Sequence, residues 1–252
     1  MGKNKLKKFA EMESFDCVLQ YPREKLISEG FPHAGKWGNE VFTHPQPIVL
    51  ELGCGKGEYT VALAKTSNDK NHIGVDIKGA RIWSGAKEVE KNGISNAAFL
   101  RTEIENIDHF FAPGEIDEIW ITFPDPQMQK VRKRLTSTRF LQLYGKFLKP
   151  GGIIHLKTDS PFLFEYTRRV ADINKFDILT ITDDLYGSGM ADPVKSIKTA
   201  YESQWLARGK KIKYICMRPH QYDNLLEPPA DDIPKDDYRA WPRHSNMADT
   251  IQ

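Results

Sequence analysis

The sequence brings a glycine loop and a carboxylate together between residues 48 and 76. Residues 48 to 57 read Ile-Val-Leu-Glu-Leu-Gly-Cys-Gly-Lys-Gly, an apolar strand that runs into glycines. Gly53, Gly55 and Gly57 let the backbone turn sharply and approach a ligand closely. A second apolar run ends in Asp76, where a carboxylate can bind the hydroxyls of a ribose. The pattern predicts a site for an adenosine-type cofactor.

A second acid indicates which cofactor this is. Dinucleotide sites use Gly-x-Gly-x-x-Gly to hold a pyrophosphate at a helix N-terminus, whereas the spacing here is Gly-x-Gly-x-Gly. Glu51 precedes the loop, and an acid there repels phosphate but suits an amino-acid ammonium group. S-adenosylmethionine has that ammonium group and no phosphate, so the loop favours it. A nicotinamide-dependent dehydrogenase is the alternative, because an acid after the second strand suits either ribose.

A third carboxylate lies in a stiff turn after the predicted strand 116 to 122. The turn reads Thr-Phe-Pro-Asp-Pro, with Asp125 between Pro124 and Pro126. Proline fixes its own φ and restricts the residue before it, so Asp125 is well placed for catalysis. The alternative is that Asp125 only caps a turn. A basic cluster follows at residues 130 to 134. Such runs are usually solvated, but beside a ligand site they can bind the phosphates of a polynucleotide.

Two later motifs could recognise a purine. Lys-Thr-Asp, ending at Asp159, closes the predicted strand 153 to 158, and Thr-Ala-Tyr-Glu at 199 to 202 opens a helix. Either acid could be a helix cap, and the proline after Asp159 and Ser160 favours this. A carboxylate can also accept the N1–H and N2–H of guanine. The N7 and O6 atoms of guanine are acceptors and need Lys, Arg or hydroxyl donors.

Alternating apolar runs and amphipathic segments place these residues on one fold. Strands are predicted at 48–52, 73–76, 97–100, 116–122 and 153–158, and helices at 59–64, 80–91, 138–148 and 162–171. The Lys-Pro-Gly-Gly run at 149 to 152 is expected to stop the third of these helices. Strands alternating with helices predict an α/β, doubly wound, mostly parallel sheet, which binds its ligand beyond the carboxyl ends of its strands. The loops after residues 52, 76, 101, 122 and 158 should share that rim.

The flanking regions are less regular. We expect a mobile basic start with four lysines in the first eight residues, followed by a segment up to residue 47 that docks over the rim. Residues 178–181 and 212–217 suggest two closing strands, with a helix at 198–208 between them. The tail from 219 to 252 has seven acids, three basic residues and five prolines, and is expected outside the core. Its Tyr222, Tyr238 and Trp241 could pack as an arm.

Composition excludes several classes of protein. The chain has 252 residues and 40% apolar content, enough for one sizeable core. Three cysteines form no Cys-x-x-Cys pair and the seven histidines are scattered, so neither a disulfide framework nor a metal site is predicted. No signal peptide or membrane-spanning run is recognisable, so we expect a cytoplasmic protein that does not bind membranes. Cys54 lacks a histidine at a recognisable spacing, and His155 lies in an apolar strand, so neither is a predicted catalyst.

In combination the motifs resemble the bacterial tRNA (guanine-N7-)-methyltransferase family of TrmB type, in order from about residue 48 to 218. The motifs are Leu-Glu-Leu-Gly-Cys-Gly-Lys-Gly at 50, Gly-Val-Asp at 74, Phe-Pro-Asp-Pro at 123, Arg-Lys-Arg-Leu at 132, Lys-Thr-Asp at 157 and Thr-Ala-Tyr-Glu at 199. The resemblance implies a class I S-adenosylmethionine-dependent methyltransferase fold. It also implies methyl transfer to N7 of a guanine in the tRNA variable loop. The domain at 48–218 would follow a basic extension and docking segment at 1–47 and precede the acidic tail at 219–252.

The resemblance also implies roles for particular residues. Glu51, Asp76 and Glu103 look like cofactor contacts, and Asp125 like the catalytic acid, also close to the cofactor. The expected substrate contacts are Lys130, Asp159, Thr199, Ala200, Tyr201 and Glu202. The chain departs from the family twice. The stretch from Gln127 to Arg134 is shorter than the family's usual Trp, Pro and basic run, so the place of Lys130 depends on the gap; and Glu103 stands where the family often has Asp.

Other functions stay open on the residues alone. A non-enzymatic RNA-binding module would explain the basic clusters but neither the glycine loop nor Asp125. A methyltransferase acting on DNA, another nucleic acid or protein would use the same cofactor site, so the resemblance supplies the argument for tRNA. Both a monomer and a homodimer are compatible with the sequence.

Overall fold

The computed structural model describes residues 2–236, with the side chains of residues 2–6 excepted. Within this range the sheet has eight strands in the order β1-β4-β3-β2-β5-β6-β8-β7. Its strands are β1 (Val18–Gln20), β2 (Ile48–Leu52), β3 (Asn71–Asp76), β4 (Ala97–Arg101), β5 (Ile116–Thr122), β6 (Leu148–Thr158), β7 (Asp177–Thr182) and β8 (Lys213–Arg218). The strands from β1 to β6 pair in parallel, and β8 pairs antiparallel with both β6 and β7. The predicted doubly wound, mostly parallel sheet is confirmed.

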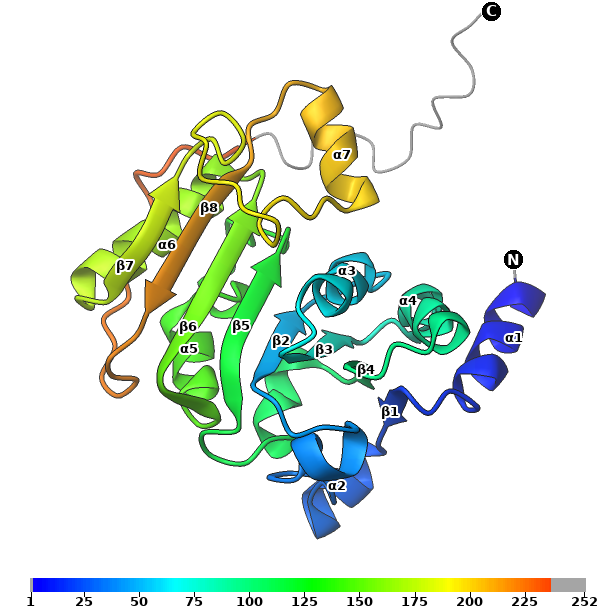
Figure 1. Ribbon diagram of the computed structural model, residues 1–252. Helices are drawn as coiled ribbons and strands as arrows, with labels where there is room; N and C mark the ends of the chain where they lie inside the picture. Colours follow the sequence, from blue (N-terminus) through cyan, green and yellow to red (C-terminus); the bar gives the residue numbers. More distant parts are fainter. Residues whose placement is uncertain (1, 237–252) are drawn as a thin grey trace, which may run out of the picture.

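Helices cover both faces of this sheet (Figure 1). The helical elements of the described residues are α1 (Gly2–Met12), α2 (Arg23–Glu29), η1 (Trp37–Val41), α3 (Glu58–Thr66), α4 (Gly79–Asn92), η2 (Ile104–His109), η3 (Val131–Lys133), α5 (Thr138–Tyr144), α6 (Pro161–Ile173) and α7 (Ala200–Ala207). In β5, Ile119 and Ile121 join the cluster that contains α5 and α6, whereas Trp120 joins the cluster that contains Tyr59 of α3. Consecutive strand residues point to opposite faces, so both faces of this central strand are buried.

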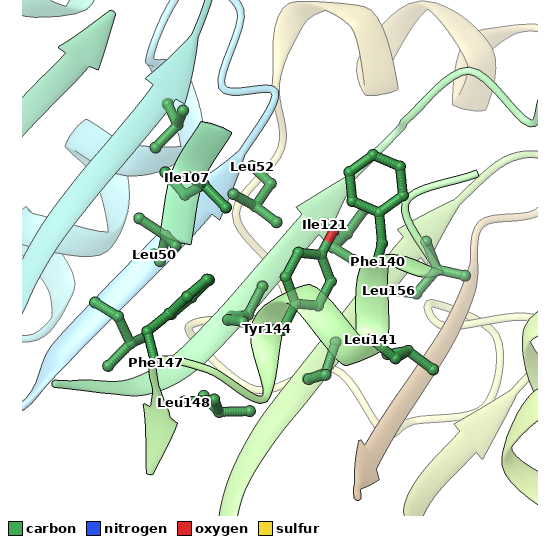
Figure 2. Close-up of a cluster of buried hydrophobic side chains, with 14 of the residues drawn as sticks. Leu50, Leu52, Ile107, Ile121, Phe140, Leu141, Tyr144, Phe147, Leu148 and Leu156 are labelled. Atoms are coloured by element: carbon green, nitrogen blue, oxygen red, sulfur yellow. The ribbon is translucent and has the colours of Figure 1, made fainter. Parts of the chain in front are cut away.

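The largest apolar cluster lies between the sheet and α5. Figure 2 shows side chains of β2, β5 and β6 gathered with Ile107 of η2 and with Phe140 and Tyr144 of α5. Leu50, Ile121 and Tyr144 are fully buried. Burial of this kind contributes about 1.5–3 kcal/mol for each large apolar side chain, so this layer fixes α5 against the strands that lead to the rim.

Helix α5 ends earlier than its apolar spacing predicts. The predicted helix ran to Leu148, but α5 stops at Tyr144 and Leu148 already belongs to β6, where it pairs with Ile116. Phe147 and Leu148 are both buried. The helical spacing of apolar residues therefore continues past the end of α5, although Leu148 already lies in a strand. Gly145 follows the helix directly, and a Cβ atom there would lie 2.2 Å from Cγ of Tyr222. The Lys-Pro-Gly-Gly run is therefore inside β6 rather than the stop of a helix.

The segment from residue 31 to 47 docks at the opposite end of the sheet from the one predicted. Backbone amides of Gly35 and Trp37 donate to Glu115, which precedes β5, at 2.8 and 3.0 Å. The indole of Trp37 donates to the carbonyl of Phe110. Asn71, the first residue of β3, donates to the carbonyl of His44. The segment thus covers the amino ends of the strands, where buried Phe110 and Phe111 receive its aromatic rings.

The basic start of the chain forms a helix beside α4. Met12 of α1 is buried, and a Cβ atom on Gly79 would lie 2.7 Å from its Cε and 2.8 Å from a ring carbon of Phe9. The indole of Trp83 donates to Glu11 at 2.7 Å. The prediction of a mobile start is therefore wrong for the last turn of α1.

The first half of the acidic tail is an arm on the core. We call residues 219–236 the C-terminal arm. Ile233 is buried in the main cluster, Arg169 of α6 pairs with Asp232 at 2.7 Å, and Glu227 accepts from the hydroxyls of Tyr166 and Thr138. The predicted place outside the core is wrong for this half, although Tyr222 does pack as proposed. Tyr238 and Trp241 lie outside the described residues.

Among the described residues, no helix has the length and apolar character needed to cross a membrane.

Candidate active site

The carboxyl ends of β2, β3, β4 and β5 surround a cavity of about 690 Å³. Strand β2 lies between β3 and β5, so the chain order reverses here, as expected for the ligand site of a doubly wound sheet. Four of the predicted site residues line the cavity: Gly53, Asp76, Glu103 and Asp125. A volume of this size falls within the usual range for a bound small molecule.

The glycine loop between β2 and α3 has the backbone that its sequence requires. Gly53, Gly55 and Gly57 have φ values of 77°, 57° and 73°, which residues other than glycine rarely adopt. A Cβ atom on Gly53 would meet nothing within 4 Å, so a ligand has room there. At Gly57 a Cβ atom would lie 2.6 Å from the ring of Phe99. The third glycine is therefore needed for the packing of α3 on the sheet.

Asp76 joins the glycine loop to the end of β3. Its Oδ2 accepts from the backbone N–H of Gly55 at 3.0 Å, and its Oδ1 accepts from the N–H of Lys78 at 2.7 Å. A carboxylate has about four acceptor positions, so both oxygens can still accept from a ligand hydroxyl. Glu103 also lines the cavity, exposed, just before η2.

Glu51 is buried beside this cavity rather than on its surface. Glu51 is 2% exposed, and it is absent from the described residues that line the cavity. Its oxygens accept from the hydroxyls of Thr60 at 2.5 Å and Thr122 at 2.7 Å. Burial raises the pKa of Glu51, and the nearby charge of Asp76 raises it further. A cation bound close to this pair would favour the charged carboxylate.

Asp125 lies on a strained turn in the cavity wall. Phe123 and Gln127 on either side have φ values of 48° and 46°, and such non-glycine residues cost on the order of 1–3 kcal/mol each. The N–H of Gln127 donates to Oδ1 of Asp125 at 3.0 Å. Asp125 therefore caps its turn, as the alternative interpretation held, and it also faces the cavity.

One member of the basic cluster supports this turn from inside. Arg134 is 3% exposed. It donates to the carbonyls of Gln127 at 3.1 Å and Met128 at 2.8 Å, and its guanidinium lies 4.4 Å from the ring centroid of Tyr166. The expectation that the whole cluster binds phosphate is therefore wrong for Arg134. Lys130, Arg132 and Lys133 are exposed, and Lys133 also lines the cavity.

Asp159 lies at the end of β6 and is not among the described residues that line the cavity. It is 8% exposed. Burial raises its pKa to about 6, with a further contribution from Asp236 of the C-terminal arm, while Lys213 and Lys210 oppose the shift. The neighbouring Ser160 donates to Asp236 at 2.5 Å and caps α6 by accepting from the N–H of Leu163. The capping role considered for Asp159 thus belongs to Ser160.

The Thr-Ala-Tyr-Glu motif forms the first turn of α7, at the carboxyl end of the sheet (Figure 1). The hydroxyl of Thr199 accepts from the N–H of Glu202 at 3.1 Å, so the capping role considered for Glu202 belongs to Thr199. The N–H of Ala200 donates to Glu58, directly after the glycine loop, at 2.6 Å. Tyr201 is 36% exposed and lies 5.5 Å from the ring of Phe123, between centroids. The motif and the cofactor loop are therefore neighbours.

Glu202 is fully buried and ion-paired. Its Oε1 lies 2.9 Å from Nζ of Lys157, which is also fully buried, and accepts from the hydroxyl of Tyr186 at 2.6 Å. The Nζ of Lys157 also donates to the carbonyls of Lys195 and Ile197. This cluster holds α7 and the segment before it against β6. Lys157 was not among the predicted site residues, although a lysine inside an apolar strand is a signal for a buried ion pair.

Two predicted exclusions concern histidine and metals. His155 is a core histidine as predicted: it stacks on Trp120 at 4.0 Å between ring centroids, and its Nδ1 lies 2.6 Å from the hydroxyl of Tyr214. Burial lowers the pKa of His155, and the carboxylate of Glu118, whose Oε1 lies 3.1 Å from its Nε2, opposes this shift. In the part of the chain that is described, no group of three or more His, Cys, Asp or Glu residues is arranged to hold a metal ion.

The chain matches known protein families over most of its length. A family described as "Putative methyltransferase" matches residues 45–215. A protein of Bacteroides thetaiotaomicron named tRNA (guanine-N(7)-)-methyltransferase is 54% identical over 96% of both chains. Proteins of the same name from Porphyromonas gingivalis and Geobacillus kaustophilus are 55% and 34% identical over 92% and 80% of this chain, and over 96% and 91% of their own lengths.

Solved structures share the fold at low sequence identity. An antibiotic-related methyltransferase superimposes with a TM-score of 0.52 and 19% identity, over 82% of this chain and 98% of its own. The 16S rRNA methyltransferase KamB gives a TM-score of 0.53 and 13% identity, over 69% and 88%. These likenesses show the fold of methyltransferases and nothing finer.

Proposed function

The chain belongs to the family of tRNA (guanine-N(7)-)-methyltransferases, and from this premise we infer that it transfers the methyl group of S-adenosylmethionine to N7 of a guanine in tRNA. The observation that carries this function is identity of 54% over 96% of the chain with a relative of that name. The lining of the cavity by Gly53 of the glycine loop, Asp76 and Asp125 supports it. We further propose a guanine of the variable loop as the acceptor and the cytoplasm, where tRNA is found, as the compartment.

The described residues fit the cofactor. The space over Gly53 admits a ligand close to the backbone, and both oxygens of Asp76 can accept from a ribose. For the cofactor site we propose Glu51, Gly53, Gly55, Gly57, Asp76, Glu103 and Asp125. When bound there, S-adenosylmethionine supplies a methyl group on a positively charged sulfur.

The chemistry requires orientation more than proton transfer. Guanine N7 has a lone pair in the ring plane, so no proton has to be removed before it attacks the methyl carbon. The site must hold N7 in line at roughly 3 Å, which is the main benefit of binding both reactants together. Positive charge then develops on the imidazole ring of guanine. An anion fixed nearby stabilises that charge, and Asp125 on its rigid turn is the proposed anion.

We propose a tRNA-binding surface that extends from the basic cluster at residues 130 to 134 to α7. Its proposed members are Lys130, Asp159, Thr199, Ala200, Tyr201 and Glu202. For Glu202 we propose an indirect role: its ion pair with Lys157 positions the first turn of α7. Residues 48–218 would be the methyltransferase domain, 1–47 an extension that docks on it, and 219–252 the acidic tail.

The function is tested with tRNA and labelled cofactor. Purified protein is incubated with unmodified bulk tRNA and methyl-labelled S-adenosylmethionine, and the tRNA is then digested to nucleosides. We expect the label in 7-methylguanosine. A transcript with adenosine in place of the variable-loop guanine should take up no label. Label in another nucleoside, or none despite measured cofactor binding, would contradict the proposed function.

The exposed basic residues should govern tRNA affinity. We expect the double variant Lys130→Gln/Arg132→Gln to raise KM for tRNA with little change in kcat, because both side chains are exposed beside the site. Removing two phosphate contacts should flatten the slope of log affinity against log salt by about 1.5. The matched control is Lys91→Gln/Lys175→Gln, two exposed lysines, one in the last turn of α4 and one just after α6. Equal slopes for both double variants would place the RNA elsewhere.

A further inference from the structure

A row of aromatic side chains leads from the cavity along α7. The ring of Phe123, which lines the cavity next to Asp125, lies 5.5 Å from the ring of Tyr201 between centroids. Tyr201 lies 5.8 Å from Trp205, and the guanidinium of Arg208 lies 5.0 Å from the ring of Trp205. Residues three and four apart share one face of a helix, so α7 presents this row along one side.

Tyr201 differs from its neighbour in the row by its exposure. Trp205 is 8% exposed, as a packed core residue would be, whereas Tyr201 is 36% exposed although it is a large apolar side chain. It is also fixed in place. Its turn of α7 is capped by Thr199, tied to Glu58 through Ala200, and anchored by the buried pair of Glu202 with Lys157. An exposed aromatic ring on a rigid turn is a suitable surface for stacking.

The proposed reaction requires a guanine to reach the cavity. A base that takes part in tRNA stacking has to leave its neighbours before an enzyme can hold it in a cavity, and the lost stacking must be offset. Proteins commonly offset it with an aromatic ring, which contributes about 1–3 kcal/mol per base. Tyr201 is an exposed aromatic residue whose ring lies against Phe123, two positions before Asp125.

We propose that Tyr201 stacks on the guanine that is methylated, with Phe123 supporting the tyrosine ring from the cavity side. This inference rests on the proposed function and adds the group that holds the acceptor base. Phe123 keeps a left-handed backbone with φ of 48°, which places its ring against Tyr201 at a cost in strain. The guanidinium of Arg208 lies 5.0 Å from the ring centroid of Trp205 in the row, and Nζ of Lys198, just before α7, lies 4.4 Å from the ring centroid of Tyr186. Both cations suit a phosphate backbone near α7.

The test compares Tyr201→Leu with Tyr201→Phe. We expect Tyr201→Leu to lower kcat/KM for tRNA by about 5- to 150-fold, which corresponds to the loss of one base–aromatic stack. Tyr201→Phe retains the ring and should stay within about threefold of the unchanged protein. The dissociation constant of S-adenosylmethionine should be the same for all three. Leu179→Ala, at an exposed apolar residue of β7, is the control for general effects of removing an exposed apolar side chain.

A fluorescent base gives a readout that a purely structural role would not change. A tRNA transcript with 2-aminopurine at the target position is bound to each variant without turnover. Stacking on tyrosine quenches this base, so the complex with Tyr201→Leu should be brighter than that with the unchanged protein. Equal brightness, or a Tyr201→Leu variant as active as the unchanged protein, would overturn the inference while leaving the proposed function intact. Absence of 7-methylguanosine with the unchanged protein would overturn both.

Discussion

Asp125→Ala is expected to lower the rate of methyl transfer by about a hundred- to a thousand-fold, the usual effect of removing one preorganised electrostatic group from a transition state. The carboxylate faces the cavity on a turn with two left-handed residues and two prolines. Its position therefore requires little reorganisation when positive charge develops on guanine. The measurement is the single-turnover rate with saturating cofactor and tRNA, together with calorimetry of cofactor binding. We expect cofactor affinity to change much less than the rate.

Asp125→Asn separates charge from geometry. The amide oxygen can still accept from the N–H of Gln127, the bond that caps the turn at 3.0 Å. If the charge is what matters, Asp125→Asn should be nearly as slow as Asp125→Ala. An asparagine variant with normal rate would mean that Asp125 only shapes the turn, and an alanine variant with normal rate would remove it from the mechanism.

Lys157→Met should have the largest effect on stability of the substitutions considered, a loss of about 3–5 kcal/mol in the free energy of unfolding. Lys157 and Glu202 are both fully buried, and methionine would leave the Glu202 carboxylate without its cation. The carbonyls of Lys195 and Ile197 would also lose a donor. Domains are typically stable by only about 5–15 kcal/mol, so the loss is a large fraction of the total. Urea denaturation followed by circular dichroism measures it.

The double variant Lys157→Met/Glu202→Leu tests whether the pair is the cause. Replacing both charges removes the uncompensated carboxylate, so much of the lost stability should return. Recovery should be incomplete, because Tyr186 and the two carbonyls still lack their partner. If the double variant is less stable than Lys157→Met by the full cost of a second core substitution, the ion pair does not account for the effect.

The elements of the fold could be predicted where the signal is local. The apolar run 48–52 and the run 116–122 are strands with the bounds that the sequence indicated. The positive φ values of the glycine loop also follow from residue type. The position of Asp125 in the cavity wall was predictable from its place after a buried strand. Each of these signals depends on neighbours within a few residues.

Features that depend on distant partners could not be predicted. The aromatic residues at 31, 37 and 42 indicate a docking segment, but its place at the amino ends of the strands depends on Glu115 and Phe110. Arg134 looked like its exposed neighbours because its burial depends on Phe162 and Tyr166. The buried ion pair of Glu202 could not be predicted from its motif, because its partner Lys157 is on another element. Side-chain type alone does not tell which charged groups of a motif are inside.

The order of strands at one side of the sheet has a consequence for synthesis of the chain. Strand β8 lies between β6 and β7, and it is made after both of them. The outer edge of β6 therefore has no partner strand until the chain has grown by about 60 residues beyond it, roughly 3–12 s at ribosomal speed. An unpaired strand edge is a template for pairing with another chain. The nascent protein thus carries an aggregation-prone edge for several seconds, and closing it depends on β8, which is made after both of its neighbours.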